Sequence, residues 1–334
     1  MMGRRLGIAA ALGSLFLAGS PALSSDPAGA VASPSMQLVT LGTGGGPSYR
    51  MKRAMSSNAV VIGDDVYVVD TGDGFLRQLT AAGLAVDRVR AVFITHHHYD
   101  HNADLGPLLA FRWLAGQHAP LPIIGPPMTT QMVTDQARAY RAIELAPITI
   151  GGPEQPPIAP TAAPRDLPAD LVEPAVVYQD GNVTVKAVLN DHYHFAEGSE
   201  AARLSRSYAL RFEAPSRTIV FTGDTGPSAR VERLARGADL LVAEVIDVER
   251  IERQWRESGR ADAAFVDGLV AHLREDHLTP ADVGKLAAGA KVGRVVLSHI
   301  VPGWDEETDF GVYSKGVTLH YDGPVHVASD LDRF

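Results

Sequence analysis

The sequence predicts an α/β fold in which two β-sheets pack face to face with helices on the outside. Apolar, strand-like runs come first as a hairpin block and then alternate with helix-like segments. The same order returns in the second half of the chain, as two similar layers would require. With 46% hydrophobic and 21% charged residues among 334, the chain is also large enough to bury a sizeable core.

The first half of the chain begins, after its leading segment, with a strand and a glycine-rich turn. A hairpin is expected next, because two apolar runs flank Gly63-Asp64-Asp65. A helix that ends at Gly83 and a buried strand then lead into a histidine-rich loop, and a further helix and strand follow. The predicted elements are strands over 36–41, 58–62, 66–70, 91–94 and 121–124 and helices over 75–82 and 102–117.

The second half repeats short strands that end in polar turns and alternate with helices. The predicted elements are strands over 183–189, 208–212, 218–221, 240–243 and 295–297 and helices over 227–236 and 280–290. Residues 147–174 carry eight prolines and are predicted to be a loop or wrap between the halves. Residues 246–273 are predicted to be a partly apolar helical insertion. Each of these segments either walls a pocket or covers the core.

The first 32 residues are typical of a secretory signal peptide. Arg4 and Arg5 precede an apolar run of thirteen residues, and Ala30-Val31-Ala32 offers a cleavage site before Ser33, with Ser24 as a competing site. The apolar run is too short to span a bilayer. We therefore expect cleavage of residues 1–32, a single domain over 33–334 with no membrane span, and a location in the periplasm or outside the cell.

The composition excludes several classes of chemistry. The chain has no cysteine, so thiolate ligands, a cysteine nucleophile and disulfides are ruled out, and any metal ligand must offer nitrogen or oxygen. Loss of Arg4, Arg5 and Asp26 with the signal peptide moves the formal charge from −9 to −10. Because non-specific affinity for nucleic acid comes from lysine and arginine, this acidity argues against a nucleic-acid partner and favours a small molecule.

The most informative segment is Thr95-His96-His97-His98-Tyr99-Asp100-His101, which follows a buried apolar strand. A strand that ends in a tight loop can direct His96 and His98 to one point, while Asp100 and His101 turn toward a neighbouring point. Clusters of such residues are typical of metal sites, and the spacing fits two metal ions. The alternative is that His97 and Tyr99 matter and that the other residues are solvated.

Three further residues follow predicted strands, where loops gather functional groups over a rigid scaffold. They are His192 after 183–189, Asp224 after 218–221 and His299 after 295–297. A lone histidine in such a place is more often a structural hydrogen-bonding group. Together with the cluster at 96–101, however, the three residues complete a plausible dinuclear site.

These residues resemble the five metal-binding motifs of the metallo-β-lactamase fold superfamily. The matching segments are 95–101, His192, Phe221-Thr222-Gly223-Asp224-Thr225 and Leu297-Ser298-His299. Further segments are similar to the RNase Z branch and its related arylsulfatases, namely 41–44, Asp70-Thr71-Gly72-Asp73-Gly74 with Gln78-Leu79, Ile124-Gly125-Pro126, and Glu244.

The resemblance implies a four-layer αββα sandwich with metals at one edge. By the same resemblance His96, His98 and His192 bind the first ion, Asp100, His101 and His299 bind the second, and Asp224 bridges them. We expect zinc because nitrogen-rich sites suit it, with manganese or iron as alternatives. His194 is the alternative to His192 as a ligand of the first ion. His192 is preferred because the sequence of residues 187–192 resembles the third motif of the family.

The resemblance also implies the chemistry, in which a metal-bridging hydroxide attacks an ester-like substrate. Asp100 supplies negative charge that tunes the site. The phrase Asp276-His277-Leu278-Thr279 resembles the His-Ser-Thr phrase of RNase Z, in which the histidine protonates the leaving group. His277 is therefore a catalytic candidate together with Asp100, although leucine replaces serine here and a helix-capping histidine is the alternative.

We expect a secreted, dinuclear metal hydrolase acting on a small ester-like substrate, with aryl sulfates or phosphodiesters first and lactones or β-lactams next. One alternative is an RNase Z-type tRNA 3′-end endonuclease, although no glycine- and basic-rich arm of the kind that grips tRNA is evident. Another is a non-catalytic binding protein on the same fold. Because relatives are commonly dimers, a homodimer is a further expectation.

Overall fold

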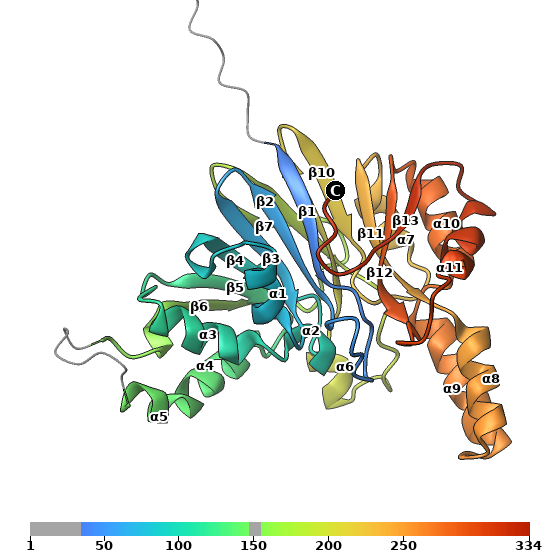
Figure 1. Cartoon of the computed structure of the whole chain (residues 1–334), viewed down its shortest axis with the longest axis horizontal. Helices are drawn as coiled ribbons and strands as arrows, with labels where there is room; N and C mark the ends of the chain where they lie inside the picture. The colour runs from blue at the N-terminus through green and yellow to red at the C-terminus, as the bar shows by residue number, and fades with distance from the viewer. Residues whose placement is uncertain (1–34, 147–154) are drawn as a thin grey trace, which may run out of the picture. The chain divides into compact units, whose positions relative to one another are not determined.

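The structure is a computed structural model and describes residues 35–146 and 155–334 (Figure 1). The predicted signal peptide over 1–32 lies outside the described residues, as does part of the proline-rich segment. No helix in the described part of the chain is long and apolar enough to cross a membrane.

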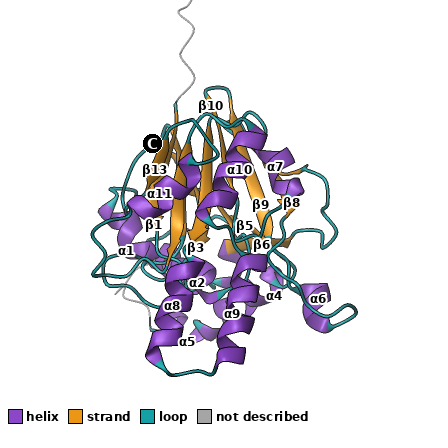
Figure 2. Ribbon diagram, turned by 90° about the vertical axis from the view of Figure 1, so that its right-hand side faces the viewer, coloured by secondary structure: helices purple, strands orange, loops and turns teal. Residues whose placement is uncertain are grey.

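Two β-sheets form the centre of the structure, and each contains strands that follow one another in the chain (Figures 1 and 2). The first sheet has the order β1-β2-β3-β4-β5-β6, with β1 Met36–Gly42, β2 Ser57–Ile62, β3 Asp65–Thr71, β4 Val89–Phe93, β5 Leu121–Gly125 and β6 Ala162–Asp166. The second has the order β13-β12-β11-β10-β9-β8-β7, with β7 Ala175–Gln179, β8 Thr184–Leu189, β9 Tyr208–Ala214, β10 Arg217–Phe221, β11 Leu240–Ile246, β12 Val295–Val301 and β13 Val325–Val327.

Helices cover the outer face of each sheet (Figure 2). The helices of the first half are α1 Phe75–Ala81, α2 Tyr99–Asn102, α3 Leu105–Leu114, α4 Thr129–Ala139 and α5 Arg141–Glu144, with 3-10 turns at Val86–Arg88 and Ala159–Thr161. Those of the second half are α6 Glu200–Leu204, α7 Ala229–Ala235, α8 Val248–Ser258, α9 Ala263–Asp276, α10 Pro280–Ala290 and α11 Gly311–Thr318.

The core lies in three apolar layers, which explains why both faces of most strands are apolar. Leu38 of β1 packs between the two sheets, whereas its neighbour Val39 packs under α1 and α3. In the second sheet Ile219 faces the space between the sheets and Val220 packs under α7 and α10. Because successive side chains of a strand point to opposite faces, this alternation places each sheet between its partner sheet and a helical layer. The predicted αββα sandwich is confirmed.

The strand directions bring several loops to one edge. Strands β3 to β6 are parallel, as are β10 to β13, and β8 runs in the same direction as β10 because both are antiparallel to β9. In such sheets the carboxyl ends of parallel strands gather the loops that bind ligands. The segments after β4, β8 and β10, which carry His96, His192 and Asp224, therefore meet at this edge.

Two parts of the first half depart from the sequence-based expectation. The segment 147–174 is not loop throughout, because β6 pairs in parallel with β5 inside it. Pro164 obscured this strand, but β6 is the outer strand of its sheet, where a missing N–H is tolerated. Helix α4 was not expected either. Its buried residues include only two apolar side chains, Val133 and Ala137, so few apolar residues mark this helix in the sequence.

The predicted helical insertion at 246–273 is confirmed as a hairpin of α8 and α9, which lie side by side and extend away from the sheets (Figures 1 and 2). The side chains of Asp247 and Asp262 cap the two helices by accepting hydrogen bonds from backbone N–H groups in the first turn. Ile251 and Trp255 of α8 pack in the same apolar cluster as Leu269 of α9. The apolar residues of the hairpin thus bury one another.

Candidate metal centre

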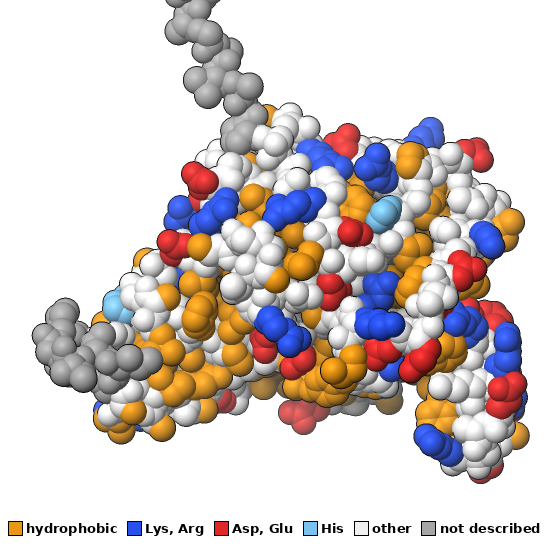
Figure 3. Space-filling view, viewed as in Figure 1, with side chains coloured by type: hydrophobic (Ala, Val, Ile, Leu, Met, Phe, Trp, Pro, Cys, Tyr) orange, Lys and Arg blue, Asp and Glu red, His pale blue; other side chains and the backbone are white. Residues whose placement is uncertain are grey.

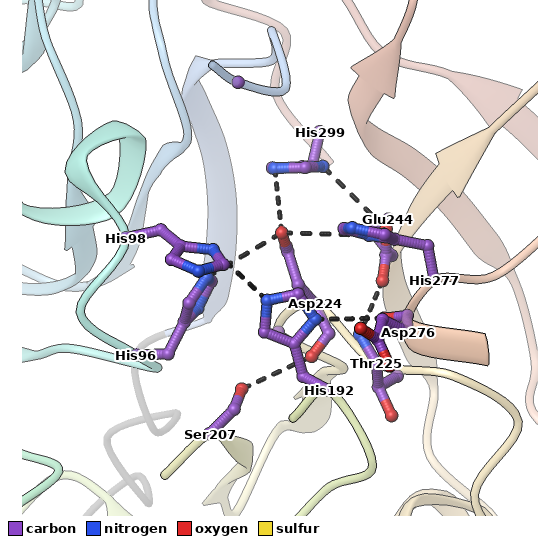
Figure 4. Close-up of polar contacts among 12 residues, drawn as sticks. His96, His98, His192, Ser207, Asp224, Thr225, Glu244, Asp276, His277 and His299 are labelled. Atoms are coloured by element: carbon purple, nitrogen blue, oxygen red, sulfur yellow. Dashed lines mark hydrogen bonds and ion pairs between the residues drawn. The ribbon is translucent and has the colours of Figure 1, made fainter. Parts of the chain in front are cut away.

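Seven predicted ligand residues lie together at the edge formed by the segments after β4, β8 and β10 and by part of β12. Figure 4 labels five of them, His96, His98, His192, Asp224 and His299. The first group contains His96, His98, His192 and Asp224, each of which offers a donor atom within 4.8 Å of the others. The three imidazole rings of this group have centroids 4.7 to 4.9 Å apart. His98 is exposed, while the other three residues are buried.

The second group contains Asp100, His101 and His299, which again offer donor atoms within 4.8 Å of one another. His299 Nε2 lies 3.1 Å from Asp100 Oδ2 and 3.1 Å from Asp224 Oδ2. Asp224 Oδ1 lies 3.4 Å from His101 Nε2, and its Oδ2 lies 3.8 Å from His96 Nε2. Asp224 therefore stands between the two groups, as Figure 4 shows.

A bulge in β12 directs His299 into this centre. Ala243 of β11 pairs with Leu297 and Val245 with Ile300, so Ser298 and His299 together face the single residue Glu244. His299 has a φ of 44°, which turns its side chain out of the regular alternation. The expectation that the strand ends at Leu297 was wrong. β12 continues to Val301, and the bulge, rather than a strand end, places the imidazole.

A second bulge, in β3, positions a residue to which the sequence analysis gave no role. Asp70 has a φ of 61° and interrupts the pairing of β3 with β2. Its buried carboxylate accepts hydrogen bonds from Thr95 N–H at 2.8 Å and from His101 Nδ1 at 2.8 Å. Because Nδ1 of His101 is held in this way, Nε2 is left for the centre. The feature of the sequence that could have indicated this role is that Asp70 is an acidic residue directly after the apolar run of β3.

The two histidines of the segment after β8 have different surroundings. His192 is buried and donates from Nδ1 to the carbonyl oxygen of Asp276 at 2.9 Å, which leaves Nε2 directed at the first group. His194 is half exposed and pairs with the Asp276 carboxylate instead. The structure thus brings His192 into the centre and leaves His194 outside it.

Several polar atoms of the centre make no hydrogen bond within the described part of the chain, which bears on whether cations fit. His96 Nε2, His101 Nε2 and Asp224 Oδ1 are buried and make no hydrogen bond within the described residues. Buried polar atoms are rarely left in this state, because desolvation without a partner costs about 1–3 kcal/mol each. Imidazole nitrogens and carboxylate oxygens converging on a common point are the donor set that divalent zinc takes. The residues present fit two cations.

The charges of the centre lead to the same conclusion. Burial opposes the charged form of His299, but Asp224 and Asp100 raise its pKa to about 10. Burial likewise favours the neutral form of Asp224, yet His299 and His101 hold its pKa well below the usual range. In contrast, burial lowers the pKa of His192 to about 3. The carboxylates thus demand positive charge on the side of the second group, while the first group offers neutral imidazoles.

His277 lies beside the centre and has a buried partner. It follows the last residue of α9, and its Nδ1 lies 2.7 Å from Glu244 Oε2 and 4.0 Å from Asp224 Oδ2. Glu244 also accepts a hydrogen bond from Thr225 N–H through its other oxygen. Burial opposes the charged form of His277, but Glu244 raises the pKa of this histidine. The single acidic residue inside the apolar strand β11 was the signal for this pairing.

Aromatic side chains lie near the exposed His98. The ring of Tyr193 lies 5.3 Å from that of His98 and stacks on Phe195 at 5.1 Å. The exposed Tyr99, next to His98 in the chain, shares a hydrogen bond of 2.9 Å with Tyr49 of the segment between β1 and β2. A planar group that reached the centre would therefore meet aromatic faces.

Comparison with known proteins finds relatives over most of the chain. The family model for the beta-lactamase superfamily domain matches residues 66–300. A protein named Ribonuclease Z from Mycolicibacterium gilvum (strain PYR-GCK) is 28% identical over 309 residues, covering 89% of this chain and 95% of the relative. A Ribonuclease Z from Mycobacterium sp. (strain KMS) is 30% identical over 275 residues, covering 80% of this chain and 85% of the relative.

Solved structures share the fold. The metallo-beta-lactamase fold protein YhfI from Bacillus subtilis superposes with a TM-score of 0.60 at 21% identity, over 90% of this chain and 99% of that protein. The short form of human tRNase Z superposes with a TM-score of 0.59 at 21% identity, over 90% of this chain and 98% of that protein.

Proposed function

The chain belongs to the β-lactamase superfamily, on the ribonuclease Z branch that its motifs resemble, and from this premise we propose that it cleaves phosphodiester bonds with two divalent cations. The observation that carries the proposal is the convergence of seven donor residues, with Asp224 between the two groups. The hydrolase fold and its donor clusters are compatible with two divalent metals. Zinc, the phosphodiester substrate and the individual ligand roles belong to the proposal.

We assign the two cations to the two groups. His96, His98 and His192 hold the first, Asp100, His101 and His299 hold the second, and Asp224 is shared. When bound, two such cations would supply Lewis-acid chemistry, namely a water of lowered pKa and polarisation of the substrate's phosphoryl oxygen. Asp70 and the carbonyl oxygen of Asp276 fix the imidazoles of His101 and His192 for this task.

In this proposal Glu244 orients His277, and His277 protonates the leaving group of the substrate. Glu244 Oε2 accepts a hydrogen bond of 2.7 Å from His277 Nδ1, and Glu244 Oε1 accepts one from Thr225 N–H. With Nδ1 held in this way, Nε2 of His277 is the atom that can pass a proton to the departing oxygen. The proposed role is thus that of a general acid, as the resemblance implied.

The comparisons favour the ribonuclease alternative over the aryl sulfate substrate with which the sequence analysis began. The curated relatives are named Ribonuclease Z, and the bond that such an enzyme cleaves is an RNA phosphodiester. The names of these relatives give no support to sulfate esters, lactones or β-lactams. The stacking surfaces of Tyr193 and Phe195 suit a nucleobase next to the scissile bond.

A small phosphodiester is the second candidate, because the charge distribution favours it. The formal charge is −9, and on the face drawn in Figure 3 basic and acidic side chains are interspersed. Two arginines of the α8–α9 hairpin are also paired with carboxylates, since Arg256 pairs with Glu252 and Asp267, and Arg274 pairs with Glu249. A long RNA would find little cationic surface there.

From the sequence alone we propose that residues 1–32 direct export and that the mature chain begins at Ser33 in the periplasm or outside the cell. We also propose a homodimer. N-terminal sequencing of the protein recovered from its host, and light scattering of the purified protein, test these two points separately.

One panel of substrates tests the proposed function. The zinc-loaded protein is given a tRNA precursor with a 3′ trailer, bis(4-nitrophenyl) phosphate and 4-nitrophenyl sulfate, each with and without a chelator. We expect cleavage of the phosphodiesters, loss of activity with the chelator and recovery with added zinc. Faster cleavage of the sulfate than of either diester, or activity indifferent to chelation, would contradict the proposal.

A further inference from the structure

A second cluster of metal-ligand side chains lies outside the centre, at the base of the α8–α9 hairpin. It consists of His194, from the segment after β8, and of His272, Glu275 and Asp276, from the last turns of α9. We call these four residues the rim cluster. None of them was assigned a role above, except that the carbonyl oxygen of Asp276 holds His192.

The geometry of the rim cluster centres on one buried carboxylate. The Asp276 side chain is only 6% exposed, and its two oxygens contact two imidazoles, His194 Nδ1 on one side and His272 Nδ1 at 2.6 Å on the other. Glu275 Oε1 lies 3.9 Å from His194 Nε2. One donor atom from each of His194, Glu275 and Asp276 lies within 4.8 Å of the other two. Ligands around one zinc ion stand roughly 3–4 Å apart, so small side-chain rotations close this set.

The exposure of the cluster permits those rotations. The side chains of His194, His272 and Glu275 are 41%, 59% and 62% exposed, so each can turn toward a common point and an ion can enter from solvent. A site with one fixed carboxylate and three adjustable donors can form around an ion on binding.

The charge of the cluster is uncompensated by basic side chains. Within the described residues the ion-pair partners of Glu275 and Asp276 are the two imidazoles, with no lysine or arginine among them. Neutral imidazoles leave two negative charges side by side, and a divalent cation offsets them. Two nitrogen and two oxygen donors suit zinc, cobalt or nickel better than magnesium or calcium, which prefer oxygen alone.

We propose that the rim cluster is a third cation site, distinct from the dinuclear centre, which binds a zinc-like divalent ion through His194, His272, Glu275 and Asp276. Occupation of this site fixes Asp276, whose carbonyl oxygen orients His192, and ties α9 to the segment after β8. The competing explanation is a hydrogen-bonded clamp, in which the two imidazoles donate to Asp276 and no ion is needed. The two explanations differ in the number of ions bound per chain.

Metal stoichiometry tests the proposal directly and does not depend on turnover. The full chain is saturated with zinc, dialysed against zinc-free buffer and measured by mass spectrometry of the metal. We expect three equivalents for the wild type and two for the double variant His194→Ala/His272→Ala, which leaves Asp276 and its contact with His192 in place. His326→Ala is the matched control, because His326 pairs with Asp332 at 3.2 Å in an exposed position away from the cluster, and it retains three equivalents.

A structural readout covers the case in which the third ion dissociates during dialysis. Crystals soaked in zinc are measured at the zinc absorption edge, and an anomalous peak between His194 and Asp276 is expected in the wild type and absent in the double variant. A wild type without this peak, or a double variant that keeps it, would overturn the proposal and leave the clamp.

Discussion

The dinuclear centre and the rim cluster are built from the same kinds of side chain and share Asp276 as a neighbour, yet they differ in burial and in what orients their donors. In the centre, His101 is held by Asp70 and His192 by the carbonyl oxygen of Asp276. In the rim cluster the two imidazoles are 41% and 59% exposed, and Asp276 is the residue that contacts both. The difference teaches that pre-organised donors mark a catalytic centre, whereas adjustable donors mark a site that forms on binding.

If burial and shared ligation make the centre, removal of its shared carboxylate should have the largest effect. Asp224→Asn replaces one of the two carboxylate oxygens with an amide NH2 group and removes the negative charge between the groups, so we expect both ions of the centre to be lost and turnover to fall by about 1000-fold or more. Metal analysis and bis(4-nitrophenyl) phosphate assays measure this. Asp135→Asn, an exposed change on α4, is the control and leaves both values unchanged. Retention of both ions in Asp224→Asn would remove the bridging role.

Loss of the proton donor should be the next largest effect and should spare the metals. His277→Ala removes the group that Glu244 orients, so we expect about 10²- to 10⁴-fold slower cleavage of an RNA diester. The loss should be much smaller for bis(4-nitrophenyl) phosphate, whose leaving group needs no proton. Metal content should stay at the wild-type value. Equal losses on both substrates would argue that His277 has only a structural role.

A smaller effect is expected for a residue that acts through a ligand. Asp70→Asn keeps a side chain that tolerates the positive φ of this position but weakens the hold on His101 Nδ1. We expect about 10- to 100-fold weaker binding of the second cation, measured by competition with a chelator. Asp64→Asn, in the exposed turn of the same hairpin, controls for the charge change. Unaltered affinity in Asp70→Asn would show that orientation from outside the ligand set is unimportant here.

The smallest effect is expected for Phe195, which stacks on Tyr193 and is not one of the proposed metal ligands. Phe195→Ala removes a ring that stacks on Tyr193, so KM for an RNA substrate should rise about fivefold while kcat and metal content stay constant. Phe111→Ala is the matched control, because Phe111 is exposed to the same degree on α3. An unchanged KM in Phe195→Ala would indicate that substrate does not reach this ring.

Local patterns in the sequence were sufficient for much of the fold. The hairpin of β2 and β3 and the helix at 280–290 were predicted because two apolar runs around a glycine-containing turn and a proline at the start of a helix are local signals. β6 was missed because Pro164 mimics a loop, and its strand character depends on pairing with β5, which sequence alone does not reveal.

In the candidate site, too, residues marked by a local sequence pattern were predicted, whereas those that depend on strand pairing or packing were not. The segment 95–101 was evident because its ligand-type residues are adjacent in the chain, and Asp224 because it follows a predicted strand. The position of His299 was misjudged, since a bulge depends on how β12 pairs with β11. Asp70 and Glu244 were recognised only as parts of segments that resemble the family, and their roles as partners of His101 and His277 were not predicted, for a similar reason. They act through side chains brought near only by the packing of the sheets.

Anomalous diffraction from a zinc-saturated crystal, recorded at the zinc edge, tests the central claim most directly. The account predicts two strong peaks on either side of Asp224, one among His96, His98 and His192 and the other among Asp100, His101 and His299. A map with no peak next to Asp224, or with a single peak that only one of the groups approaches, would contradict it.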